Sequence, residues 1–499
     1  MTTIGPKFAM NTVKRVAKNS FVTISAKAIS SLPSLLSLAL IARYLSPDLF
    51  GEYIFVTAFI TIFEVFTDMG YNSILVREIA RAKDRLHKLI GTAIVAKSFV
   101  ALLTFIIIFI SAQVLSLVVH LSPEAKKAIY ILGFAVCMDF FTDIVISAVR
   151  AHERMEYEGA ITIFNSTTSL AFIALVTVLD LGFISLFWAK LCSIVLTMGL
   201  SLFIYLKKFG IPQFRQESGM RKDLTREALP LGIGQVIERF YTRTNFILIR
   251  IIKSVTEVGF YGGAYKIIEQ LSLISVSVVT AVFPLFSVLS QSSRASLALA
   301  HGKTFKVLAV MSLPIVVILS FLSEQITAIV FGSKHIQIAQ PLRILAFAVF
   351  LTFSNLLFKF TLSAVNRQTL YRFNAIVAFF VNLSAALLLI PSYGYVGACI
   401  AFLASSSILF ILGHYSVAKN LPGVSLSVLA KPAAASLIMA LVIIFTKDIN
   451  VFFAAACGIF AYAVALIALK TFTSEEMSLL KRKTTSMKKD YSEETTKHA

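Results

Sequence analysis

Pairs of ionisable residues four positions apart lie inside long apolar runs of this chain: Glu64 and Asp68, Asp139 and Asp143, Arg239 and Arg243. Residues four apart share one face of a helix, and like charges on one face repel each other. Each pair therefore needs an opposite charge, a proton, a cation or a charged ligand close by. Arginine forks bind phosphate oxygens two at a time, and a carboxylate can hold a proton or a sodium ion.

The apolar runs contain seven basic and six acidic residues in all: Lys27, Lys97, Lys190, Arg239, Arg243, Lys266, Lys359, Glu64, Asp68, Asp139, Asp143, Glu238 and Glu269. Ionised and facing lipid, they would together cost about 35–40 kcal/mol at roughly 2.5–3.5 kcal/mol each. This exceeds an ordinary folding stability, so most must face water or one another. We expect Lys97, Lys190 and Lys359, near the ends of their runs, to reach the membrane interface with their flexible stems.

Two interpretations of the central charges remain open. In the first, the acidic pairs only neutralise basic groups of neighbouring helices. In the second, Arg239 and Arg243 bind the anionic head of a substrate, and an acid of the pairs Glu64–Asp68 or Asp139–Asp143 carries a coupling proton or Na⁺. Further residues of such a binding site would be Lys27, Lys266, Glu238 and Glu269. Tyr241, Tyr261 and Tyr265 are candidates to contact a sugar.

Signs of catalysis or of a metal site are absent from the sequence. The four cysteines lie in apolar runs without a C-x-x-C or a histidine set, which argues against a zinc site or a disulfide framework. No phosphate-binding P-loop motif is present, and Asp139–Asp143 reads DFFTD rather than D-x-D. We therefore expect no catalytic residue, no metal and no cofactor beyond a coupling ion.

The composition indicates a membrane protein. Of the 499 residues, 57 % are hydrophobic and only 14 % charged, with a mean hydropathy of +0.83. Soluble chains are about half apolar and one quarter charged, and this surplus exceeds what a soluble core can hide. The net charge of +20 lies mostly in short segments between apolar runs, so membrane topology explains it better than a nucleic-acid partner.

Fourteen segments are long and apolar enough to cross a bilayer, which takes roughly 20 residues: 20–43, 51–76, 90–118, 128–150, 159–179, 183–206, 228–252, 258–288, 304–323, 341–363, 371–391, 395–417, 425–446 and 450–470. With the N-terminus inside, the inward segments hold 31 lysines and arginines and the outward segments 8. Positive charge favours the cytoplasmic side. We therefore predict a multi-pass protein of the cytoplasmic membrane with both termini in the cytoplasm.

The two halves of the chain echo each other. Phe50-Gly51-Glu52-Tyr53 aligns with Val258-Gly259-Phe260-Tyr261 at an offset of 208 residues. Each copy contains a helix, a short outward turn with one acid, a Gly-x-Tyr sequence and another helix. Repeated halves are typical of transporters that open alternately to each side around a central site.

Several motifs resemble one family. RYLSPDLFGEY, FTDMGYNSILVREIAR, ALPLGIGQVIERFYTRTNFILI with EVGFYGGAYKIIE, PLRILAF and IPSYGYVGACIAF follow one another in the order and spacing of the polysaccharide (O-antigen type) flippases. These belong to the multidrug/oligosaccharidyl-lipid/polysaccharide exporter superfamily. The resemblance implies two six-helix lobes around a central cavity and two further helices. It also implies outward movement of an oligosaccharide on a polyprenyl or dolichyl (pyro)phosphate, beside the glycosyltransferases and polymerase of the same pathway.

The expected organisation is an all-α integral membrane protein with pseudo-symmetric lobes. It comprises an amphipathic cytoplasmic segment (1–19), an N-lobe of six helices (20–206), a cytoplasmic linker (207–227), a C-lobe of six helices (228–417), helices 13 and 14 (425–470) and a charged cytoplasmic tail (471–499). Two other functions stay open. One is a cation-coupled exporter of drugs or small solutes with the same fold. The other is a membrane-embedded glycosyltransferase or polymerase, which the short outer loops disfavour.

Overall fold

The computed structural model describes residues 6–119, 121–214, 218–421 and 423–472. These residues form helices and short connections without strands. The α-helices are α1 (Pro6–Tyr44), α2 (Pro47–Asp68), α3 (Tyr71–Arg81), α4 (Leu86–Val118), α5 (Pro123–Ala151), α6 (Met155–Val178), α7 (Phe183–Phe209), α8 (Ser218–Ile252), α9 (Val255–Ser292), α10 (Arg294–Phe321), α11 (Ser323–Val330), α12 (Ala339–Ala364), α13 (Gln368–Asn420), α14 (Ala430–Thr446) and α15 (Val451–Ala468). Short 3₁₀ helices are η1 (Lys83–Arg85), η2 (Ser333–Ile338) and η3 (Leu426–Leu429).

The prediction of an all-α, multi-pass membrane protein is confirmed. Twelve helices of the described residues are long and apolar enough to cross a membrane. The expected number was fourteen, and two helices account for the difference. Charged residues lower the hydropathy of α8, so it is not among the twelve, and α13 contains two predicted spans in 53 residues. Eight residues of a straight helix would span about 12 Å, yet Gly397 packs against the carbonyl oxygen of Leu389. The chain therefore reverses its direction at Gly394.

Three boundaries differ from the prediction in ways that move functional residues. The predicted span 51–76 breaks after Asp68, because Met69 and Gly70 adopt left-handed backbone conformations with φ of 42° and 81°. Helix α4 begins at Leu86, four residues before the predicted start. Helix α1 runs from Pro6 to Tyr44 without a break, where a separate interfacial helix was expected in 1–19. The tail beyond residue 472 lies outside the described residues.

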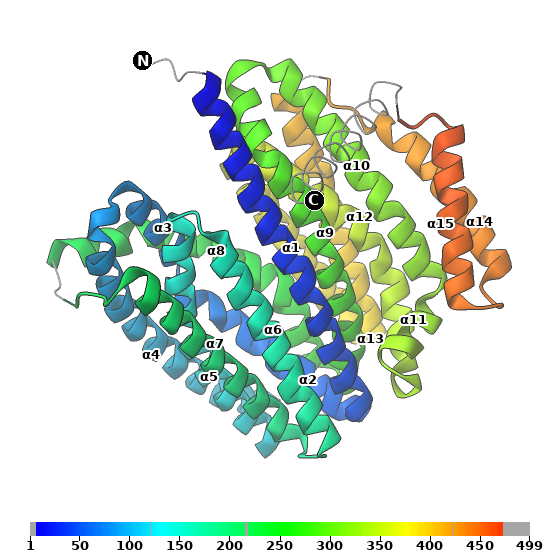
Figure 1. The fold of residues 1–499 in the computed structure, drawn as a ribbon. Coiled ribbons are helices and arrows are strands. Elements are labelled where there is room, and N and C mark those ends of the chain that lie inside the picture. Colours follow the sequence, from blue (N-terminus) through cyan, green and yellow to red (C-terminus); the bar gives the residue numbers. More distant parts are fainter. Residues whose placement is uncertain (1–5, 120, 215–217, 422, 473–499) are drawn as a thin grey trace, which may run out of the picture.

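The helices pack in two groups with α1 and α8 beside them (Figure 1). Helices α2 to α7 lie on one side and α9 to α13 on the other. Helix α1 packs mainly against α6, and α8 contacts both α2 and α13. Helices α14 and α15 pack on each other and on α10 at one edge (orange to red in Figure 1). The division into lobes at 20–206 and 228–417 stays a prediction.

The repeat at an offset of 208 residues extends to the helix ends. Helices α1 and α8 end at Tyr44 and Ile252, and α2 and α9 begin at Pro47 and Val255. The residues before these starts, Ser46 and Ser254, are both N-caps whose side chains accept a hydrogen bond from a backbone N–H three residues on. This end of α2 and α9, which the charge pattern predicts to face outward, is called the outer end below.

Candidate functional site

A cavity of about 510 Å³, the central cavity, lies between the two groups of helices. Its lining comes from α2, α3, α5, α8 and α9, and hence from both halves of the chain. It includes eight of the ten residues that the sequence indicated for the site: Glu64, Asp68, Asp139, Asp143, Glu238, Arg239, Arg243 and Glu269. The helical spacing of four places each pair on one face, and here all three faces line the same space.

Arg243 lies at the wall of the central cavity and is only 4 % exposed. Its Nη2 donates to Glu269 Oε1 at 2.5 Å, and Lys266 Nζ donates to the other carboxylate oxygen at 2.8 Å. The Arg243 guanidinium also lies 5.6 Å from the ring centres of Phe246 and Tyr265. Its Nε and Nη1 have no hydrogen-bond partner among the described residues. Two nitrogen atoms of a buried cation thus lack an acceptor in this conformation.

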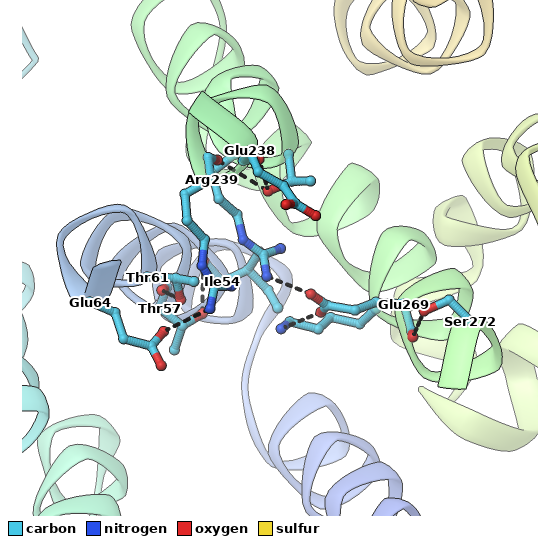
Figure 2. Close-up of polar contacts among 11 residues, drawn as sticks. Ile54, Thr57, Thr61, Glu64, Glu238, Arg239, Glu269 and Ser272 are labelled. Carbon is cyan, nitrogen blue, oxygen red and sulfur yellow. Dashed lines mark hydrogen bonds and ion pairs between the residues drawn. The ribbon is translucent and has the colours of Figure 1, made fainter. Parts of the chain in front are cut away.

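Arg239 is held more loosely than Arg243. Figure 2 shows it extending from α8 toward Glu64 of α2, and the Nη2–Oε2 distance is 3.9 Å. Both side chains line the cavity, and their exposed fractions are 40 % for Arg239 and 46 % for Glu64. An ion pair of this length and exposure contributes little stability, so Arg239 can exchange its partner for an incoming anion at little cost.

The acidic pairs of α2 and α5 meet at Lys97, which corrects the expectation that this lysine reaches the membrane interface. Lys97 is fully buried, and its Nζ donates to Asn72 Oδ1 at 2.9 Å. The same Nζ lies 3.6 Å from Asp68 and 3.8 Å from Asp143. The earlier start of α4 sets Lys97 about three turns into the helix, which is too deep to reach the interface. Neutralisation by a neighbouring helix therefore accounts for Asp68 and Asp143.

The other two lysines expected at the interface both line cavities, and their reach to the interface stays a prediction. Lys359 of α12 binds both carboxylate oxygens of Glu238 on α8, each at 3.0 Å. Lys190 of α7 lines a second cavity of about 450 Å³, together with Lys266, Glu64 and Asp139. These contacts depend on the exact helix boundaries and on the side from which each helix packs, which the sequence pattern alone does not contain.

The other predicted residues take different places. Lys27 of α1 lines neither the central cavity nor the second cavity. Asp139 lines both cavities, and within the described residues it forms no ion pair. Tyr261 is fully buried and accepts a hydrogen bond from Asn245, whereas Tyr241 and Tyr265 line a third cavity of about 700 Å³.

Comparison with protein families finds a match to the polysaccharide biosynthesis protein family over residues 16–290. The chain is 22 % identical over 414 residues to a protein of Haloferax volcanii described as a probable low-salt glycan biosynthesis flippase, Agl15, covering 80 % of this chain and 83 % of the relative. It is 26 % identical over 404 residues to an uncharacterized membrane protein of Methanocaldococcus jannaschii, covering 74 % and 78 % of the two chains.

Solved structures share the fold. The lipid II flippase MurJ in an inward closed conformation matches with a TM-score of 0.77 at 17 % identity, over 90 % of this chain and 99 % of that chain. An inward-facing multidrug resistance MATE family transporter matches with a TM-score of 0.66 at 14 % identity, over 80 % and 98 %. At these identities the two matches show a shared fold.

Proposed function

The chain belongs to the polysaccharide biosynthesis protein family, and from this premise we propose that it moves a lipid-linked oligosaccharide across the cytoplasmic membrane. The substrate carries a polyprenyl or dolichyl (pyro)phosphate, and transport runs outward for the synthesis of a surface polysaccharide or glycan. The likeness to a described glycan biosynthesis flippase supports this proposal, and so does the shared fold with a lipid II flippase.

The observation that carries the proposal is the state of Arg243. A buried guanidinium with two unpartnered donors is expensive to maintain, and it lies beside a second, loosely paired arginine in a cavity lined by both halves of the chain. Phosphate and pyrophosphate present several acceptor oxygens in one plane, which the arginine fork matches with two bonds. Arg239 and Arg243 together would bind the linker phosphates at the centre of the membrane.

Contacts at the outer end support our proposal of alternating access. There the hydroxyl of Thr256 donates to Asp48, and His335 Nε2 donates to the backbone oxygen of Ala42 at 2.7 Å. Both bonds join the first half of the chain to the second and would break when the cavity opens outward. Asp139, which lacks an ion-pair partner among the described residues, is our candidate for the coupling proton or Na⁺.

Conservative exchange of the two arginines tests the proposal. Lysine keeps the charge but offers a point donor, so Arg239→Lys with Arg243→Lys should slow flipping of a lipid-linked oligosaccharide in proteoliposomes by about tenfold or more. Expression and thermal stability are followed in parallel. Arg343→Lys is the control, because Arg343 does not line the central cavity. It forms an ion pair with the exposed Glu324, and the N–O distance is 3.0 Å. Full transport by the double variant at normal expression would remove both residues from the substrate site.

A second candidate function is the export of drugs or other small solutes. The fold shared with a multidrug transporter and the third cavity, whose exposed lining is mostly apolar, favour it. The same proteoliposomes decide between the two functions. Uptake of a cationic dye driven by a pH or Na⁺ gradient, without flipping of the lipid-linked oligosaccharide, would establish the exporter.

A further inference from the structure

Two further cavities with different exposed surfaces share lining residues with the central cavity. The cavity of about 450 Å³ lies between α1, α2, α5, α6, α7 and α9, and we call it the hydroxyl chamber. The cavity of about 700 Å³ lies between α8, α9, α12 and α13, and we call it the apolar chamber. From this asymmetry we infer that the substrate binds in one orientation, with its sugar in the hydroxyl chamber and the first isoprene units of its lipid in the apolar chamber. The inference rests on the proposed function.

The hydroxyl chamber is built for a polyhydroxylated ligand. Ten serine, threonine, asparagine and glutamine residues line it, together with Lys190, Lys266, Glu64 and Asp139. Thr57 and Thr61 of α2 donate their hydroxyl protons to backbone oxygens at 2.9 and 2.7 Å, which leaves the hydroxyl oxygens as acceptors. Ser37 Oγ and Gln270 Oε1 have no hydrogen-bond partner among the described residues. A sugar supplies both donors and acceptors to such a lining.

The apolar chamber differs from the hydroxyl chamber in the surface that it exposes, since ten serine, threonine, asparagine and glutamine residues line it too, with Glu238, Glu269, Lys359 and Arg372. Ile237, Ile376 and Phe402 are among eight isoleucine, leucine, valine and phenylalanine residues of its lining, with three tyrosines beside them. Its exposed lining is mostly apolar, whereas that of the hydroxyl chamber is about equally polar and apolar. Hydrocarbon here would cover less polar surface than it would in the hydroxyl chamber.

Both chambers share walls with the phosphate site. Glu64 and Asp139 line the central cavity and the hydroxyl chamber, while Glu238 and Glu269 line the central cavity and the apolar chamber. A phosphate bound at Arg239 and Arg243 therefore has the hydroxyl chamber on one side and the apolar chamber on the other. In a lipid-linked sugar the phosphate also lies between the two parts, so the order of the molecule matches the order of the cavities.

Energetics favour this orientation over the reverse. A sugar hydroxyl moved from water into an apolar site without a new hydrogen bond costs about 1–3 kcal/mol. An isoprene unit in the hydroxyl chamber would exclude water from the hydroxyl oxygens of Thr57 and Thr61 and leave them without a donor. Each part of the substrate thus matches the exposed surface of one chamber better than that of the other. The hydrophobic effect adds no binding free energy in the apolar chamber, because the lipid tail moves there from an equally apolar bilayer.

Two probes that each represent half of the substrate test the orientation. One is a water-soluble oligosaccharyl phosphate without lipid, and the other is a prenyl phosphate without sugar. Each competes with a labelled prenyl-pyrophosphate-linked oligosaccharide for the purified full-length protein. The variants are Thr57→Val with Thr61→Val, which removes two hydroxyls at constant shape, and Ile376→Trp, which fills the apolar chamber. Thr244→Val and Leu388→Trp repeat these substitutions at positions that line none of the three cavities.

The threonine variant should weaken binding of the oligosaccharyl phosphate about tenfold and leave that of the prenyl phosphate unchanged. Ile376→Trp should do the reverse, and both controls should bind like the unmodified protein. A crossed pattern, or equal loss of both probes in either variant, overturns the orientation while the proposed function stands. If the unmodified protein binds neither probe and does not flip the lipid-linked oligosaccharide, the proposed function fails and the orientation fails with it.

Discussion

Gly51 and Gly259, equivalent residues of the two copies of the repeat, touch each other at the outer end. A Cβ atom on Gly259 would lie 2.9 Å from the Cα atom of Gly51, and one on Gly51 would lie 2.0 Å from the carbonyl oxygen of Val255. Asp48 and Thr256 form a hydrogen bond, and a Cβ atom on Gly262 would lie 2.2 Å from Ile54 Cγ2, again at an offset of 208. Residues that contact their own equivalents lie on the axis that relates the copies, so this axis passes between α2 and α9.

The first prediction concerns this glycine contact. Gly259→Ala adds a methyl group where backbone leaves no room, and overpacking costs about 1–3 kcal/mol. We expect a lower melting temperature in detergent and slower flipping, because the closed outer end forms less readily. Gly302→Ala is the control: nothing lies within 4 Å of its added Cβ atom, and alanine favours a helix. A Gly259→Ala protein as stable as the Gly302→Ala protein would contradict the close approach.

The second prediction concerns His335, which is fully buried in η2. Because its Nε2 donates to Ala42, His335→Ala leaves a buried carbonyl oxygen at the end of α1 without its donor. The free energy of unfolding should fall by about 1–3 kcal/mol. Hydrogen–deuterium exchange should increase around residues 42–46, and it should stay low in His335→Gln, whose amide can donate in its place. Unchanged exchange in His335→Ala would show that this bond does not hold the outer end closed.

The third prediction concerns Lys97. Replacing it by methionine keeps the volume but removes the cation between Asp68 and Asp143. Loss of one partner of a fully buried pair costs about 3–5 kcal/mol. Because the two acids are partly exposed to the cavity, we expect the free energy of unfolding to fall by about 2 kcal/mol. Asp143→Asn in the Lys97→Met background should restore part of the melting temperature. Equal stability of the Lys97→Met and unmodified proteins would exclude a neutralising role.

Patterns in the sequence predicted the parts of the fold that depend on composition. Apolar length located the twelve helices that could cross a membrane, and spacing by four placed Arg239 with Arg243 on one face. The offset of 208 indicated the repeat, and the equivalent contacts between α2 and α9 agree with it.

Packing decided the rest of the candidate site. Which face of α4 meets α2 and α5 depends on helix rotation, so the burial of Lys97 was not predictable from its distance to a span end. The break after Asp68 was hidden as well, because Met69 in a left-handed conformation carries no strong sequence signal. Lys359 and Glu238 are 121 positions apart in the sequence, and no local pattern predicts such a contact.

The last prediction is the orientation in the membrane, with both termini in the cytoplasm. Its basis is the ratio of 31 inward to 8 outward lysines and arginines. Single cysteines are introduced after Cys137, Cys192, Cys399 and Cys457 are replaced by alanine, and intact cells are treated with a maleimide that does not cross the membrane. Cysteines at Ser333 and Ser392 should react from outside, and one at Ser218 only after lysis. Reaction of the Ser218→Cys protein in intact cells would show that the topology is the reverse of the predicted one. The outer end, which contains Gly51 and Gly259, would then face the cytoplasm.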